Sequence, residues 1–291
     1  MSKRLAVVFV GAVVLAGLAI AAGKARSKSD VNPAVEGPAR ESIAENPKMP
    51  VLPQRPEGAE LGMPAIEKAR QNKKYLFAFF WKEKDEQMAA MKSVFERAMA
   101  EVADRADSVV VNVTEPAERR IVDKFQLDRA PMPLVLALAP NGAITGGFPN
   151  KFEEKDLLDA FATPCCERCM KALQDKKLVF VCVQNEATKS NAAAMQGVRD
   201  FRADPQYREV TEIVTLDPAD KAEASFLADL KISSKTADAV TALLAPPGAV
   251  IAEFKGQTTK KDLVAALQKA SSGCCPGGAC GPNGSPPKDQ P

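Results

Sequence analysis

Two stretches of this 291-residue chain match each other closely enough to indicate an internal repeat. Residues 138–144 (LAPNGAI) match residues 244–250 (LAPPGAV), and the triplet Lys-Asp-Leu at 155–157 recurs at 261–263, at the same distance from the turn. Two matches in one register are not expected by chance, and they indicate that one supersecondary unit has been copied. The repeat therefore predicts two domains of the same kind, and an apolar content of 46% is enough to give each its own core.

The first copy contains an apolar run, Tyr75 to Trp81, that stops abruptly at the charged residues 82–85. Apolar residues at helical spacing follow, which predicts a buried strand leading directly into a long helix. A single proline, Pro133, immediately precedes a second apolar run at 134–138. After an initial short helix, the predicted order of elements through this copy is β-α-β-α-β-β-α.

This combination resembles the thioredoxin-like superfamily. Members of that family carry a redox Cys-x-x-Cys directly after the tryptophan, at the start of the first long helix, and face it with a cis-proline at the start of the third strand. Here Trp81 and Pro133 occupy the matching positions, whereas the two cysteine positions hold Lys82 and Asp85. The resemblance therefore implies the fold, with Trp81 and Pro133 as fold-determining and peptide-facing residues, but without the redox pair.

The second copy is more degenerate than the first. Its first strand is expected at 178–183 and its long helix at 186–201, yet neither a tryptophan nor a cysteine pair lies between them. The register that matches Pro133 falls on Ala239. The resemblance in this half therefore depends on the repeat.

The expected fold class is α/β, with two tandem thioredoxin-like domains, each a central mixed sheet flanked by helices, after an N-terminal apolar helix and a Pro-rich linker. The expected boundaries are a signal peptide or membrane anchor at 1–22, the linker at 23–57, domain 1 at 58–163, a Cys-containing connector at 164–175, domain 2 at 176–271 and a flexible Cys/Gly/Pro tail at 272–291.

The N-terminus carries Lys3 and Arg4, and an uncharged apolar run follows at 5–22. A basic front before such a run is typical of a secretory signal or a single membrane anchor. We therefore expect an exported protein that faces the periplasm or the extracellular space, associated with a membrane if residues 5–22 are retained. The 39 basic and 37 acidic residues nearly cancel, which argues against nucleic acid as a partner.

Six of the seven cysteines form two similar clusters, one after the closing helix expected in each copy. The clusters are Cys165, Cys166 and Cys169, and Cys274, Cys275 and Cys280. Three interpretations remain open: structural disulfides, which an oxidising compartment favours; a thiolate site for Cu(I) or Zn(II); and a redox pair, Cys166 and Cys169, at a helix start. The seventh, Cys182, lies in an apolar run and is expected in the core.

Histidine is absent, so Ser-His-Asp and Cys-His arrangements are excluded, and a metal site has to use thiolates or carboxylates. We expect a redox-inactive binding or scaffolding protein whose partner is a protein or peptide, without a resident cofactor. One alternative is a Cu(I)- or Zn(II)-binding protein that uses the six clustered cysteines. The other is a thiol-disulfide oxidoreductase that uses the displaced Cys166 and Cys169.

Overall fold

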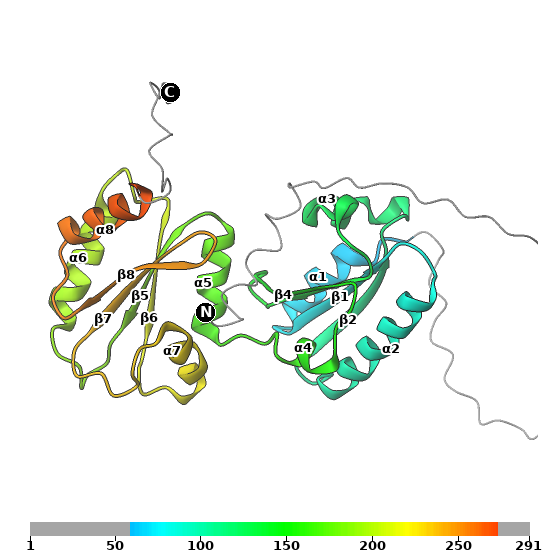
Figure 1. The fold of residues 1–291 in the computed structure, drawn as a ribbon, viewed down its shortest axis with the longest axis horizontal. Helices are drawn as coiled ribbons and strands as arrows, with labels where there is room; N and C mark the ends of the chain where they lie inside the picture. Colours follow the sequence, from blue (N-terminus) through cyan, green and yellow to red (C-terminus); the bar gives the residue numbers. More distant parts are fainter. Residues whose placement is uncertain (1–58, 273–291) are drawn as a thin grey trace, which may run out of the picture.

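The structure, a computed structural model, describes residues 59–272 and contains two units of the same topology (Figure 1). The first unit, residues 59–163, consists in order of α1 (Gly62–Gln71), β1 (Tyr75–Trp81), α2 (Glu86–Glu101), β2 (Ala106–Asn112), the 3-10 turn η2 (Pro116–Glu118), α3 (Arg119–Phe125), the 3-10 turn η3 (Leu127–Arg129), β3 (Leu134–Leu138), β4 (Ile144–Pro149) and α4 (Glu154–Leu158). The second unit, residues 164–272, consists of α5 (Pro164–Gln174), β5 (Leu178–Val183), α6 (Asn191–Ala203), β6 (Thr211–Leu216), η4 (Lys221–Glu223), α7 (Ala224–Leu230), β7 (Val240–Ala245), β8 (Ala249–Lys255) and α8 (Lys260–Ser272).

Each unit is built on a four-stranded mixed sheet, with the strand order β2-β1-β3-β4 in the first and β6-β5-β7-β8 in the second. The first strand of each unit pairs in parallel with the second and antiparallel with the third, and the third pairs antiparallel with the fourth. Phe80 lies opposite Leu134 in the first sheet, and Val183 lies opposite Val240 in the second. The two sheets therefore share both strand order and strand direction.

Helices cover both faces of each sheet, which makes each unit a three-layer structure. Alternate residues of β1 point to opposite faces: Phe77 and Phe79 pack with α2 and α4, whereas Ala78 and Phe80 pack with α1 and α3. Burial on both faces explains why this strand is a continuous apolar run. In the second unit, β5 packs in the same way between α5 and α7 on one face and α6 and α8 on the other.

Residues 164–174, expected as a connector, form helix α5, which opens the second unit as α1 opens the first. Cys169, Ala172 and Leu173 pack against the second sheet. The sequence itself carries this correspondence, because residues 68–77 (KARQNKKYLF) match residues 171–180 (KALQDKKLVF). The repeated unit is therefore longer than the hairpin and closing-helix matches indicate.

Helix α5 also contacts the first unit and lies between the two sheets (Figure 1). Met170 on α5 belongs to the core of the first unit. The hydroxyl of Tyr75 donates to Glu167 Oε1 at 2.5 Å, and the side-chain amide of Gln174 pairs with both the N–H and the C=O of Ile144, at 2.9 and 2.7 Å. One helix therefore contributes to both cores.

One local prediction is wrong, and three others fall on segments outside the described residues. The prediction of a helix from Glu186 is wrong, because residues 184–190 form a hydrogen-bonded loop and α6 begins at Asn191. The apolar run at 5–22, the linker at 23–57 and the cysteines of the tail lie outside residues 59–272. Within residues 59–272, no helix has the length and apolar character needed to cross a bilayer.

Candidate functional site: the groove beside Trp81 and the thiols of helix α5

The residues at the two redox-cysteine positions lie in the short loop between β1 and α2. Lys82 is exposed, and Asp85 is the N-cap of α2, where its carboxylate accepts the N–H of Met88 at 2.7 Å. An N-cap carboxylate satisfies a backbone donor that the first turn of a helix leaves unpaired. Asp85 therefore has a structural role at the position where the resemblance implies a reactive thiol.

Trp81 and Pro133 face each other at the end of the first sheet. Phe80 pairs with Leu134, so the antiparallel register continued by one residue places Trp81 opposite Pro133. The Met132–Pro133 peptide bond is cis, as the resemblance implies, and the carbonyl of Pro133 accepts the N–H of Asn150 at 2.7 Å. Trp81 is partly exposed, and the ammonium group of Lys84 lies 5.6 Å from its ring centroid.

The loop at 82–85, which follows β1, and the segment at 130–133, which precedes β3, lie at the same end of the first sheet, and the place between them is called the groove below. In the described part of the chain, no hydrogen bond joins these two segments, and the N–H and C=O of Met132 have no hydrogen-bond partner. Met132 lies between Pro131 and Pro133, neither of which has an N–H to donate. Unpaired strand-end groups of this kind can accept an added extended segment.

The thiols of α5 lie at the other end of the first sheet. Tyr75, at the start of β1, contacts Glu167 beside Cys166, whereas Trp81 is the last residue of the same strand. A strand rises about 3.3 Å per residue, so the two ends of β1 are about 20 Å apart. Cys166 and Cys169 are therefore remote from Pro133 and do not take the place of the missing redox pair.

The four cysteines that the structure describes are not joined to one another by disulfides. Burial, together with the charge of Glu223, raises the pKa of Cys165 to about 12. Burial also raises the pKa of Cys169 well above its ordinary value and that of Cys182 to about 12. A thiol is nucleophilic as its thiolate, so these raised pKa values oppose exchange chemistry. Cys182 is 2% exposed, which confirms that it is a core residue.

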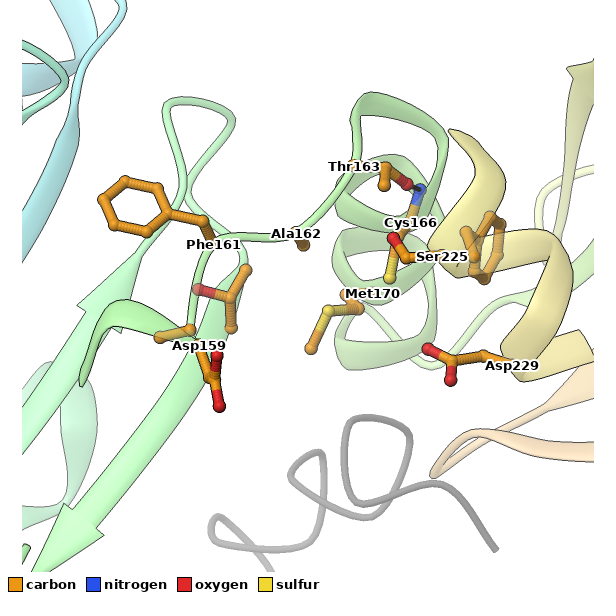
Figure 2. Close-up of a pocket in the computed structure, with 11 residues that line it drawn as sticks. Asp159, Phe161, Ala162, Thr163, Cys166, Met170, Ser225 and Asp229 are labelled. Atoms are coloured by element: carbon orange, nitrogen blue, oxygen red, sulfur yellow. Dashed lines mark hydrogen bonds between the residues drawn. The ribbon is translucent and has the colours of Figure 1, made fainter. Parts of the chain in front are cut away.

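A small pocket opens where the two units meet, and Figure 2 shows Phe161, Cys166, Met170, Ser225 and Asp229 around it. Its volume is about 20 Å³, which accommodates a water molecule but no cofactor. Burial raises the pKa of Glu167 nearby, and burial with the Glu167 hydrogen bond raises that of Tyr75. The pocket is therefore part of the packing between the units.

Comparisons with known proteins found likenesses among solved structures alone. No protein-family model matches the chain, and no curated protein matches it. Among solved structures, the chain is similar to the first two thioredoxin domains of Eps1p from Naumovozyma dairenensis, with 11% identity over 75% of this chain and 98% of that chain, at a TM-score of 0.28. Others are the zinc-bound form of human ERp44 (9% identity, 75% of this chain, 61% of that chain, TM-score 0.32) and the thioredoxin Deadhead of Drosophila melanogaster (14%, 35%, 92%, 0.28).

Strand order, strand direction and the helices on both faces decide the fold. Both units have a thioredoxin-like fold.

A buried glutamate holds the first helix of each thioredoxin-like unit. Glu118 accepts the N–H groups of Leu61 and Gly62 at 2.5 and 3.0 Å, one on each carboxylate oxygen. Its counterpart Glu223 accepts the N–H of Cys165 at 2.8 Å, but its second oxygen is buried without a hydrogen-bond partner. The residue before Cys165 is Pro164, which has no N–H, so the second donor is missing.

The described residues do not assemble a metal site around Glu223. Among residues 59–272, no three cysteine, aspartate or glutamate side chains are grouped closely enough to hold an ion. The other candidate ligands, Cys274, Cys275 and Cys280, lie outside the described residues. The metal interpretation of the cysteine clusters therefore stays a prediction.

Two features of the site were not expected from the sequence. Met132 was not singled out, although its place between two prolines signals a backbone without internal partners. Glu118 and Glu223 were also missed, although each lies in an alanine-glutamate pair at the start of the third helix of its unit.

We expect Cys165 to be alkylated by iodoacetamide at pH 8 roughly a thousandfold more slowly than an unperturbed thiol, because its pKa is about 12. Since the pKa is raised, the rate should keep rising tenfold per pH unit beyond pH 9, where an ordinary thiol levels off. Mass spectrometry of the Cys166→Ser variant isolates this thiol. Glu223→Gln should accelerate the reaction, and a wild-type rate equal to that of glutathione would contradict the assignment.

Proposed function

We propose that this chain is an exported, redox-inactive thioredoxin-like protein that binds an extended segment of a partner polypeptide. The binding site is the groove between the loop at 82–85 and the segment at 130–133. The segment pairs with the backbone of Met132 and contacts the exposed part of the Trp81 ring. Export is expected from the apolar run at 5–22 and rests on the sequence alone.

The observation that carries the proposal is the unpaired backbone of Met132 at the mouth of the groove. Backbone groups at a strand end are normally paired or covered, because an unmet donor or acceptor is costly when it is shielded from water. An extended peptide supplies both a donor and an acceptor in the required spacing. Trp81 adds apolar contact area beside these groups, as aromatic residues commonly do in binding sites.

The geometry favours binding over the two alternatives. An oxidoreductase needs an accessible thiolate, whereas Cys169 is 2% exposed and the pKa of Cys165 is about 12. A soft-metal protein needs converging thiolates, and the described residues hold no such group of three. A specific observation therefore supports the peptide groove, whereas neither alternative has one among the described residues.

Carboxymethylated insulin B chain is a suitable probe, because it is unfolded, has no disulfide to exchange and contains no tryptophan. Trp81 is the single tryptophan of this protein and lies beside the groove. We expect a saturable change in Trp81 fluorescence and at least tenfold slower hydrogen exchange of the Met132 amide on binding. That amide is the only one in residues 131–133, so its exchange reports the groove directly.

A matched pair of variants distinguishes binding in the groove from nonspecific binding to apolar surface. Trp81→Ala should weaken binding of fluorescein-labelled B chain at least tenfold, as measured by anisotropy. Val250→Ala truncates a more exposed apolar side chain, 45% exposed on β8, and should bind as the wild type does. Unchanged exchange at Met132 with saturating peptide would contradict the proposal, as would an insulin-reducing activity that Cys166→Ser abolishes.

A further inference from the structure

The place in the second unit that corresponds to this groove is closed by the chain itself. The N–H of Lys189 donates to the carbonyl of Ala237, and the N–H of Ala239 donates to the carbonyl of Lys189, both at 2.9 Å. These two bonds form an isolated parallel bridge between Lys189 and Asp238. Lys189 comes from the loop after β5, and Asp238 directly precedes β7, so the bridge spans the equivalent groove.

A third bond completes the closure on the side of β7. The hydroxyl of Thr236 donates to the carbonyl of Asp238 at 2.8 Å. Asp238 is the counterpart of Met132, because Ala239 and Pro133 occupy the same register position in their units. The carbonyl that is open in the first unit is therefore already paired in the second.

The loop that closes the second groove is longer than its counterpart and is internally braced. It runs from 184 to 190, whereas only residues 82–85 join β1 to α2. Thr188 Oγ1 accepts the N–H of Asn185 at 2.9 Å, and Asn191 Nδ2 donates to the carbonyl of Asn185 at 2.6 Å. Asn185 Nδ2 in turn donates to Asp217 Oδ1 at 2.8 Å. These bonds brace the loop beside residues 237–239, where Lys189 pairs with the backbone of Ala237 and Ala239.

The two grooves differ in one backbone donor, at the position held by Pro133 in the first unit and by Ala239 in the second. Ala239 has an N–H and uses it to hold Lys189, whereas a proline at the same position, Pro133, has none to give. The first unit therefore lacks both the long loop and the donor that would anchor it. The second unit has both.

We infer that the loop at 185–190 is a resident occupant of the second groove, so that each chain offers one groove to a partner polypeptide, in the first unit. This inference rests on the proposed function. It also indicates the class of ligand that such a groove accepts: an extended main chain with an available N–H and C=O, as Lys189 provides.

Two variants at one position test the inference. Lys189→Pro removes the N–H that pairs with Ala237, whereas Lys189→Ala keeps both backbone groups and serves as the matched control. We expect the wild type and Lys189→Ala to bind one carboxymethylated insulin B chain per chain in calorimetry. Lys189→Pro should bind a second peptide more weakly than the first. Its Ala239 amide should exchange at least tenfold faster than in the wild type, as measured by NMR.

The outcomes separate the two proposals. Two peptides per wild-type chain, with slowed exchange at 237–239, would overturn the inference while leaving peptide binding intact. A single peptide on Lys189→Pro despite fast exchange at Ala239 would also overturn it. If the wild type binds no peptide, the proposed function fails, and the closure is still tested: an Ala239 amide that exchanges at the unprotected rate in the wild type would refute it.

Discussion

Replacing Glu118 with alanine is expected to lower the free energy of unfolding of the first unit by about 3 kcal/mol. The carboxylate is 2% exposed and accepts two backbone N–H groups at the start of α1. Its loss leaves both donors buried without partners, and hydrogen bonds to a charged group contribute about 1.5–3 kcal/mol each. Trp81 fluorescence during urea unfolding reports this unit selectively, because the chain has no other tryptophan.

The second unit contains the matched control for this prediction. Glu223→Ala removes only one backbone hydrogen bond and also eliminates a buried oxygen that has no partner. The expected loss is therefore about half as large, or about 1.5 kcal/mol. Hydrogen exchange of β5 amides measures it independently of Trp81. Equal losses for Glu118→Ala and Glu223→Ala would show that the missing N–H of Pro164 has no energetic consequence.

Gly197→Ala is expected to destabilise the second unit by about 3 kcal/mol, opposite in sign to the usual effect of this substitution in a helix. A Cβ at Gly197 would lie 1.9 Å from the carbonyl oxygen of Thr258. This obstacle is backbone, which cannot move aside as the end of a long side chain does. The close approach lets α6 pack against the start of α8, so the substitution should separate the two helices.

Hydrogen exchange of amides in β5 and α8 measures this loss of stability. Strand β5 packs against α6, and α8 follows Thr258, which the added Cβ would displace. Ala192→Gly, at an exposed position of the same helix, isolates the intrinsic helix preference and should cost only about 1 kcal/mol. A Gly197→Ala protein as stable as the wild type would mean that α6 and α8 have room to separate without loss.

The sequence was sufficient to predict the fold class because its strongest signals are local. The run Tyr75 to Trp81 is a strand buried on both faces, and such a strand reads as continuous apolar residues. The matches at 138–144 and 244–250 correspond to the turns between β3 and β4 and between β7 and β8. The fold class of two mixed sheets flanked by helices was therefore predicted correctly.

The features that distinguish the two grooves depend on contacts between residues that are distant in the sequence. Lys189 pairs with residues about fifty positions further along the chain, and no periodicity in the loop at 184–190 indicates this. Polar residues of the Asn and Thr type compete with helix formation by bonding to nearby backbone, so α6 begins later than its apolar pattern predicts. Residues 164–174 form a helix rather than a connector, because Thr163 caps it, Pro164 fits its first turn, and Cys169, Ala172 and Leu173 pack against the second sheet.

Because α5 packs against both units, it determines where the chain can be divided into two fragments. A fragment that stops at residue 163 would lose Met170 from its core, leave the Tyr75 hydroxyl without Glu167 and expose the edge of β4 at Ile144. An exposed strand edge beside a new apolar patch favours self-association. The amino-terminal half is therefore expected to self-associate unless α5 is retained. The better point at which to divide the chain lies after Gln174, although α5 also opens the second unit.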